Sequence, residues 1–429
     1  MNAKVLVFPC GSEIGLELHN ALKWSTHVEL YGASSVPNHG RFVYKNYIDS
    51  IPDVTSRDFI AKLNDIVDAY SIDFIFPAHD SVILELLRNQ HNLHCRVISS
   101  SLETAEICRS KKKTYEYFQG KIAVPAMYTS SQEIVRWPVF LKPEIGQGSR
   151  GVFTAYSEEE RRFYIEKDHS LLVLEFLPGK EYTVDCFTDR HGKLRFVGPR
   201  ERARVSNGIS VATYDVTDDR FIDIASSLNR ELSFRGMWFF QLKENSTGDL
   251  VLLEIAPRVS GSMGLNRNKG VNFALLSIFD FLEQDIELTP NVYPLQMDRA
   301  LFSRFSVPIR YEYVYVDFDD TLVFRGRVNT FLMMFIFQAM SQGIKLCLLS
   351  RHKAKTGEDM TSVLKRYRLT DIFDEIIDVY EGEPKSRYIT QKDAIFIDDS
   401  YAERNEVSRK RRIPVFEVSM VEILIDWRY

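Results

Sequence analysis

Val139–Val152 reads VFLKPEIGQGSRGV, a short apolar run that ends at Lys142 and continues into a glycine-rich loop. The loop contains Gly146, Gly148 and Ser149. Because glycine has no side chain, backbone N–H groups can close around phosphate oxygens there, and a lysine at the strand end adds a positive point charge. The pattern predicts that Lys142 and the three loop residues bind a nucleotide phosphate, although a tight turn has a similar composition.

A second string follows at 174–185, where the sequence reads LEFLPGKEYTVD. The end of a strand, from Glu175 to Leu177, offers a carboxylate and backbone groups in the order needed to hydrogen-bond with the edge of an adenine ring. Glu181, six residues after Glu175, is positioned to bind the ribose hydroxyls. Taken singly, these acids are equally typical of exposed strand residues.

A third string covers 241–258, QLKENSTGDLVLLEIAPR. A glycine-containing turn predicts that Gln241 and Glu254 lie on two neighbouring strands with their oxygens on one side. Such hard oxygen ligands suit Mg²⁺ that bridges nucleotide phosphates. Arg258 can stabilise charge on a transferring phosphoryl group, or can form an ordinary structural ion pair.

The three strings in this order resemble the ATP-grasp superfamily, in particular ligases related to the large subunit of carbamoyl phosphate synthase, over about residues 1–290. The resemblance implies that the family phosphorylates a carboxylate to an acyl phosphate, which an amine then attacks, with ATP and Mg²⁺ as cofactors. It also implies roles for individual residues: phosphate binding by Lys111 and Lys142, an adenine hinge at Glu175 and Leu177, ribose binding by Glu181, Mg²⁺ binding by Gln241 and Glu254, and a γ-phosphate contact by Arg258. Ala256 departs from the family pattern, which usually has a metal-binding asparagine there.

The acceptor site is marked by three alternating arginines, Arg200, Arg202 and Arg204. The alternation predicts that all three lie on one face of a strand. Arginines beyond the γ-phosphate would suit an anionic carboxylate substrate, whereas an exposed basic edge strand is the other interpretation.

A second group of candidate catalytic residues begins at 313–323, where the sequence reads YVYVDFDDTLV. An apolar strand delivers Asp317 and Asp319, followed by Thr321. A carboxylate nucleophile that attacks an anionic phosphate needs Mg²⁺ to offset repulsion and a second carboxylic acid to protonate the leaving group. Further candidates follow in order along the chain: Ser350 at a strand end, Lys385, and the pair Asp398 and Asp399.

These residues resemble the four motifs of the haloacid dehalogenase superfamily, over about 313–429. The resemblance implies a Mg²⁺-dependent phosphatase in which Asp317 is the nucleophile and Asp319 the general acid and base. It implies phosphate binding by Thr321 and Ser350 and charge stabilisation by Lys385. The expected metal site contains Asp317, Asp319, Asp398 and Asp399. Only 29 positions separate Thr321 from Ser350, so a capless domain is expected.

Length, composition and charge limit the classes of protein that this chain can belong to. The 429 residues suggest about three units of ~150 residues, and the net charge of −5 argues against a nucleic-acid partner. No apolar stretch approaches the ~20 residues of a membrane helix. The five cysteines are scattered without a CxxC pair, which favours reduced thiols over a disulfide frame or zinc site. A cytoplasmic protein is expected, and the oligomeric state stays open, a homo-oligomer included.

The sequence therefore predicts an α/β and α+β multidomain protein. The expected division is a Rossmann-like domain at 1–105, ATP-grasp subdomains at 106–190 and 191–290, a linker at 291–312, and the phosphatase domain at 313–429. The leading function is a bifunctional enzyme that joins a small-molecule carboxylate to an amine and hydrolyses a phosphate monoester. The alternatives are a kinase plus phosphatase without ligation, and a nucleotide-sensing binding protein.

Overall fold

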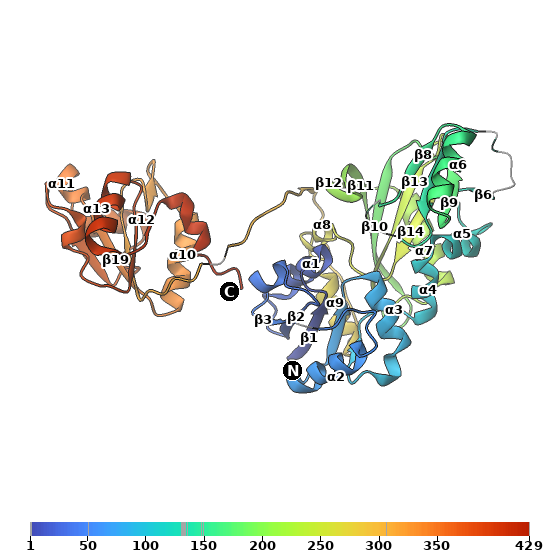
Figure 1. Ribbon diagram of the computed structural model, residues 1–429, viewed down its shortest axis with the longest axis horizontal. Coiled ribbons are helices and arrows are strands. Elements are labelled where there is room, and N and C mark those ends of the chain that lie inside the picture. The colour runs from blue at the N-terminus through green and yellow to red at the C-terminus, as the bar shows by residue number, and fades with distance from the viewer. Residues whose placement is uncertain are drawn as a thin grey trace. The chain divides into compact units, whose positions relative to one another are not determined.

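The computed structural model divides into two compact units, one that extends to Leu301 and one that begins at Phe302 (Figure 1). Each unit is described separately below. The structure describes residues 2–49, 51–129, 134, 136–146, 148, 150–305 and 307–428. Ser149, predicted to bind phosphate, lies outside the described residues.

The N-terminal unit begins with a parallel sheet of order β3-β2-β1-β4-β5. Its central strand, β1, is apolar and almost wholly buried because helices flank both faces of such a sheet. The strands are β1 (Ala3–Phe8), β2 (Val28–Ala33), β3 (Asn46–Ile48), β4 (Phe74–Pro77) and β5 (Arg96–Val97). The helices are α1 (Glu13–Leu22), α2 (Phe59–Tyr70), α3 (Asp80–Arg88) and α4 (Leu102–Arg109), with short 3₁₀ turns at His39–Phe42 and Gln90–Asn92.

A small antiparallel sheet of order β6-β9-β7-β8 follows. It contains β6 (Met127–Tyr128), β7 (Val139–Pro143), β8 (Phe153–Ala155) and β9 (Leu171–Glu175). Two helices accompany it, α5 (Lys111–Phe118) and α6 (Glu158–Lys167). The side chain of Ser157 caps the N-terminus of α6 by accepting a hydrogen bond from the Glu160 amide, which explains why the helix begins there.

The third layer is a six-stranded antiparallel sheet of order β14-β13-β10-β11-β12-β15. Its strands are β10 (Glu181–Thr188), β11 (Leu194–Ser206), β12 (Ile209–Asp215), β13 (Gly236–Glu244), β14 (Leu250–Ala256) and β15 (Gln296–Asp298). Its helices are α7 (Asp219–Glu231), α8 (Gly264–Arg267) and α9 (Phe273–Phe281). Trp238 of β13 is fully buried and stacks on Phe234 with ring centroids 3.9 Å apart, which anchors the core of this layer.

Two boundaries differ from the sequence expectation. Strand β10 was expected within the subdomain 106–190, yet it pairs with β11 and β13 in the large sheet, so the small sheet ends at Glu175. The expected linker 291–312 contains β15, which pairs with β12. Backbone pairing overrides local composition in both cases, because a strand belongs to whichever sheet satisfies its N–H and C=O groups.

The C-terminal unit is built on a parallel sheet of order β20-β19-β16-β21-β22. Its strands are β16 (Tyr313–Val316), β19 (Lys345–Ser350), β20 (Glu375–Asp378), β21 (Ala394–Ile397) and β22 (Val415–Phe416), and a separate hairpin holds β17 (Val323–Phe324) and β18 (Arg327–Val328). The helices are α10 (Thr330–Ser341), α11 (His352–Thr356), α12 (Met360–Tyr367) and α13 (Tyr401–Arg411), with 3₁₀ turns at Lys385–Arg387 and Val418–Ile423. Because the strands are parallel, the carboxyl ends of β16, β19 and β21 meet at one edge.

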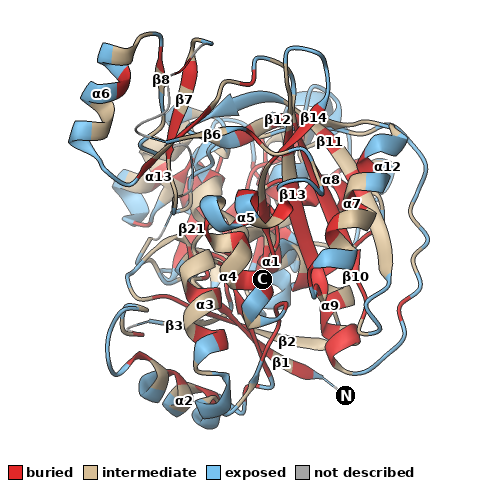
Figure 2. Ribbon diagram, turned by 90° about the vertical axis from the view of Figure 1, so that its right-hand side faces the viewer, coloured by how far each residue is buried: buried red, intermediate tan, exposed pale blue. Residues whose placement is uncertain are grey.

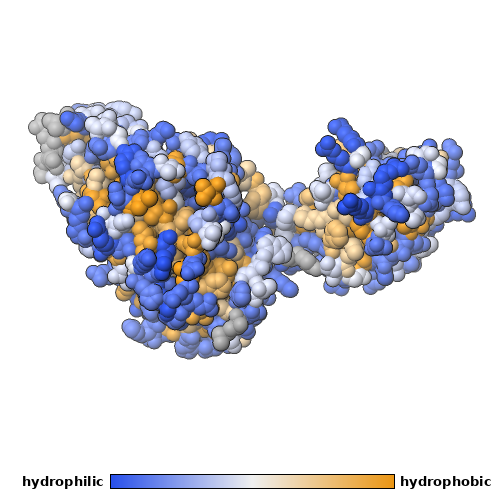
Figure 3. All heavy atoms as spheres, turned by 180° about the vertical axis from the view of Figure 1, so that it is seen from behind, coloured by the Kyte–Doolittle hydropathy of each residue, from blue (hydrophilic) through white to orange (hydrophobic). Residues whose placement is uncertain are grey.

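The buried residues lie mainly on the strands and on the helix faces that pack against them, and the outer helix faces are exposed (Figure 2). On the face seen in Figure 3, hydrophobic patches are interspersed with hydrophilic residues. Among the described helices, none combines the length and apolar character needed to cross a membrane. All five cysteines are free thiols.

Candidate functional site

Two adjoining cavities occupy the N-terminal unit. One, of about 180 Å³, is lined by residues from the small and large sheets; the other, of about 710 Å³, extends toward the N-terminal parallel sheet. Lys111, Gln241 and Glu254 line both cavities. Residues of all three strings singled out in the sequence line the smaller cavity.

Two lysines enter this space from different elements. Lys142, near the end of β7, is 7% exposed, and its Nζ lies 3.5 Å from the Leu253 carbonyl oxygen and 5.2 Å from the Tyr115 ring centroid. Burial, together with the neighbouring charge of Lys111, lowers the pKa of Lys142 to about 7. Burial also lowers the pKa of Lys111, whose Nζ donates to the Gly146 carbonyl oxygen at 3.3 Å. A polyanion that entered the cavity would relieve the repulsion between the two ammonium groups.

The expected adenine hinge lines the smaller cavity. Leu177 is buried, and the Glu175 carboxylate accepts a hydrogen bond from the Ala126 amide at 3.3 Å. Glu181 also lines this cavity, but its Oε1 is 2.7 Å from Nε of Arg202. A ribose contact by Glu181 would therefore involve a carboxylate that already shares an ion pair.

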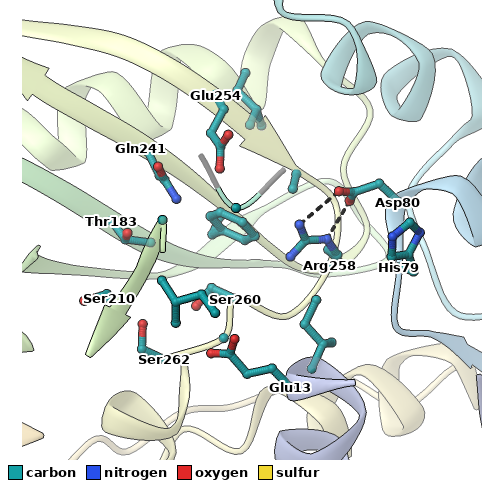
Figure 4. Close-up of a pocket in the computed structure, with 18 of the residues that line it drawn as sticks. Glu13, His79, Asp80, Thr183, Ser210, Gln241, Glu254, Arg258, Ser260 and Ser262 are labelled. Atoms are coloured by element: carbon teal, nitrogen blue, oxygen red, sulfur yellow. Dashed lines mark hydrogen bonds and ion pairs between the residues drawn. The ribbon is translucent and has the colours of Figure 1, made fainter. Parts of the chain in front are cut away.

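Gln241 and Glu254 are directly opposite each other on the antiparallel strands β13 and β14, as the sequence predicted. Their side chains lie on the same side of the sheet in Figure 4. Both supply oxygen atoms, which are the ligands that Mg²⁺ prefers, so the pair is chemically suited to hold that ion. Ala256, two residues after Glu254, lines the larger cavity without a side-chain ligand.

Arg258 also lines the larger cavity, but its guanidinium is already paired. It makes two hydrogen bonds to the Asp80 carboxylate at the start of α3, one of them Nη2 to Oδ2 at 3.0 Å (Figure 4). Burial alone would raise the pKa of Asp80, yet Arg258 outweighs this and holds it below its usual range. Arg258 therefore bridges the large sheet and the N-terminal sheet at the wall of the cavity.

The prediction that three arginines share one strand face is wrong for Arg204 only, because Arg200 and Arg202 both line the larger cavity. A register shift occurs between Arg202 and Arg204, and Arg204 lies 60% exposed against Asp298. Arg200 is fully buried, and its guanidinium donates to Asp185 at 2.9 and 3.2 Å and to two serine hydroxyls. Because a bulge rotates the side chains that follow it, simple alternation fails here.

The second site lies at the edge where the strands of the C-terminal unit end. Lys385 Nζ is 2.6 Å from Oδ1 of Asp317 and 2.6 Å from Oδ2 of Asp398, and all three side chains are buried. Burial raises the pKa of Asp317, which the charge of Lys385 only partly offsets. Asp317, Asp398 and Asp399 offer oxygens within 4.8 Å of one another, a donor set that fits a hard divalent cation.

Thr321 and Ser350 also lie at this edge. The Thr321 hydroxyl accepts from the Asp399 amide at 2.9 Å, and the Ser350 hydroxyl accepts from the His352 amide at 3.1 Å. Thr321 thus joins the loop after β16 to the loop after β21, and Ser350 holds the start of the segment that leads into α11. Asp319, expected among the metal ligands, lies outside the acidic cluster, and its Oδ1 is 2.8 Å from Nδ1 of His352.

One residue of these sites, His352, was missed from the sequence. Asp80 follows a strand end, which marks it as a candidate, but its pairing with Arg258 spans 178 positions and has no local signal. His352 lies two residues after Ser350, and a titratable side chain just beyond a strand end was the available signal.

Residues 167–299 match the family described as "ATP-grasp in the biosynthetic pathway with Ter operon". The chain is 27% identical over 148 residues to a D-alanine–D-alanine ligase of Petrotoga mobilis, covering 32% of this chain and 48% of that protein. It is 28% identical over 142 residues to the carbamoyl phosphate synthase large chain of Clostridium botulinum, covering 30% and 13%. The chain thus spans about half or less of these curated relatives.

Solved structures share the fold at low identity. An N5-carboxyaminoimidazole synthetase from Staphylococcus aureus, complexed with ADP, matches with a TM-score of 0.58 and 14% identity over 70% of this chain and 82% of that one. The biotin carboxylase domain of a Hydrogenobacter thermophilus carboxylase matches with a TM-score of 0.55 and 16% identity over 68% and 72%. These matches confirm the expected ATP-grasp fold over 70% and 68% of this chain.

Proposed function

We propose that the N-terminal unit is an ATP-dependent ligase that activates a small-molecule carboxylate as an acyl phosphate and transfers the acyl group to an amine. The observation that carries this proposal is the convergence of Lys111, Lys142, Gln241 and Glu254 on the smaller cavity. Two cations and two oxygen ligands, from α5, β7 and the β13–β14 hairpin, suit a triphosphate with its metal ion. The ATP-grasp fold and the match to ligases support the same reaction class.

Within this proposal, Gln241 and Glu254 would hold Mg²⁺, which supplies charge neutralisation between the nucleotide phosphates. Lys111 and Lys142 bind phosphate oxygens, and the segment from Glu175 to Leu177 binds the adenine edge. Arg258 remains on the acceptor side, where Asp80 fixes the direction of its guanidinium. The larger cavity then receives the carboxylate and the amine.

We propose a second activity for the C-terminal unit, hydrolysis of a phosphate monoester. The observation that carries it is the buried triangle of Asp317, Lys385 and Asp398, because a carboxylate held beside a cation and a second acid suits nucleophilic attack on phosphorus. Asp319 would protonate the leaving oxygen, and Thr321 and Ser350 would bind phosphate. Asp317, Asp398 and Asp399 would hold Mg²⁺, which offsets repulsion between the nucleophile and its anionic substrate.

Two alternatives make different products. A kinase without ligation would release a stable phosphorylated acceptor and consume no amine. A nucleotide-sensing protein would bind ATP and produce ADP at a rate independent of every acceptor; the alanine at position 256 is the observation that favours this alternative.

A screen of carboxylate and amine pairs on the intact chain tests these functions if ADP and phosphate are followed separately. Lys142→Ala should abolish ADP formation, whereas Asp317→Asn should abolish only ester hydrolysis. Lys113→Ala is the matched control, because Lys113 is an exposed lysine of the same cluster as Lys111. ADP formation that survives in Lys142→Ala, or that needs no acceptor, would contradict the ligase proposal.

A further inference from the structure

His352 is the first residue of α11 and lies beside the second aspartate of the C-terminal site. Its Nδ1 is 2.8 Å from Oδ1 of Asp319, and its side chain is only 12% exposed. An ionised carboxylate can only accept, so Nδ1 carries the proton whenever Asp319 is charged. This hydrogen bond uses one carboxylate oxygen and leaves Oδ2 for another partner.

Two further contacts hold the imidazole in place. The ring meets Phe318 edge-on, with centroids 5.1 Å apart and planes at 72°. The Ser350 hydroxyl accepts the backbone amide of His352 at 3.1 Å. His352 is thus attached to β16 through Phe318 and to β19 through Ser350, the two strands that also deliver Asp317 and the phosphate-binding hydroxyl.

The other ring nitrogen, Nε2, is buried without a hydrogen-bond partner among the described residues, and the carboxylate oxygen of Glu358 is 3.8 Å away. His352 and Asp319 both line a cavity of about 220 Å³, which Arg325 of the β17–β18 hairpin also lines. Asp319, with its Oδ1 bound to His352, therefore borders a space large enough for a small leaving group.

We propose that His352 is a positioning residue for the phosphatase reaction: it fixes Asp319 Oδ1 so that Oδ2 delivers its proton to the leaving oxygen in this cavity. The inference rests on the proposed phosphatase activity. As Asp317 attacks phosphorus, the bond from phosphorus to the leaving oxygen breaks, and the proton on Asp319 Oδ2 moves to that oxygen. Asp319 then takes one proton from the water that hydrolyses the aspartyl phosphate, which restores both carboxyl groups.

The leaving group provides the test. An alkyl phosphate needs a proton on its departing oxygen, whereas p-nitrophenyl phosphate releases a stable anion and depends little on a general acid. kcat/KM reports the steps through leaving-group departure, so the intact chain is assayed with both esters. His352→Phe keeps the ring contact with Phe318 but removes the donor. His352→Asn removes the ring but keeps an amide donor near the position of Nδ1.

For His352→Phe, kcat/KM should fall at least about tenfold more for the alkyl phosphate than for p-nitrophenyl phosphate. His352→Asn should recover most of that difference. Equal losses on the two esters in His352→Phe, or no recovery in His352→Asn, would overturn the positioning role and leave the phosphatase proposal standing. A wild-type chain that hydrolyses neither ester would refute the phosphatase activity itself, and this inference would fall with it.

Discussion

The buried ammonium group of Lys142 predicts that ATP binding takes up a proton. Lys142 has a pKa of about 7 in the empty cavity because burial and Lys111 oppose its charge. At pH 8 a group with that pKa is mostly neutral, and triphosphate oxygens would favour the ammonium form, so binding should take up about 0.9 proton at this residue. More than about one unit below its pKa the lysine is charged in both states and contributes little pH dependence. Above pH 7, affinity should fall as pH rises.

Isothermal titration of Mg-ATP into the intact chain at pH 8, in two buffers with different protonation enthalpies, measures this uptake. Lys142→Met should lower the uptake by about 0.9 proton, because methionine has similar length and no titratable group. Lys113→Met, at an exposed lysine, should retain the full value. Equal uptake in the wild type and Lys142→Met would refute the reasoning, even if the variant bound ATP more weakly.

The other predictions concern stability and catalysis. Asp185→Asn should lower the free energy of unfolding of the N-terminal unit by about 3–5 kcal/mol in urea titration, because it leaves the buried guanidinium of Arg200 without its counter-charge; a loss below about 1 kcal/mol would contradict this role. Glu254→Ala should reduce ADP formation at least about 100-fold with intact ester hydrolysis, since it removes a proposed metal ligand; undiminished ADP release would exclude that ligand. Asp317→Asn should reduce ester hydrolysis more than about 10³-fold while Mg-ATP binding is retained, and trapping of a phosphorylated aspartate in the wild type alone would identify the nucleophile.

The sequence by itself determined those features that depend on local order along the chain. Gln241 and Glu254 lie on neighbouring strands because a short glycine-containing turn joins the two strands of a hairpin. The turn alone would place Leu253 opposite Gln241, and a register shift between Gln241 and Leu242 brings Glu254 there instead. Asp317 and Asp398 converge because each follows an apolar strand of a parallel sheet, and such strands end at a common edge. Residue type and spacing therefore predict which strands carry these side chains, but not the register shift.

The tertiary structure alone decided which charges are already neutralised. Arg258 meets Asp80 across 178 positions, and Arg200 is enclosed by Asp185 although alternation suggested an open arginine face. His352 gains a role only because Asp319 lies against it, with 33 positions between them. The sequence does not show which partner a charged residue has. Ion pairs and burial arise when elements pack together, and those elements can be any distance apart along the chain.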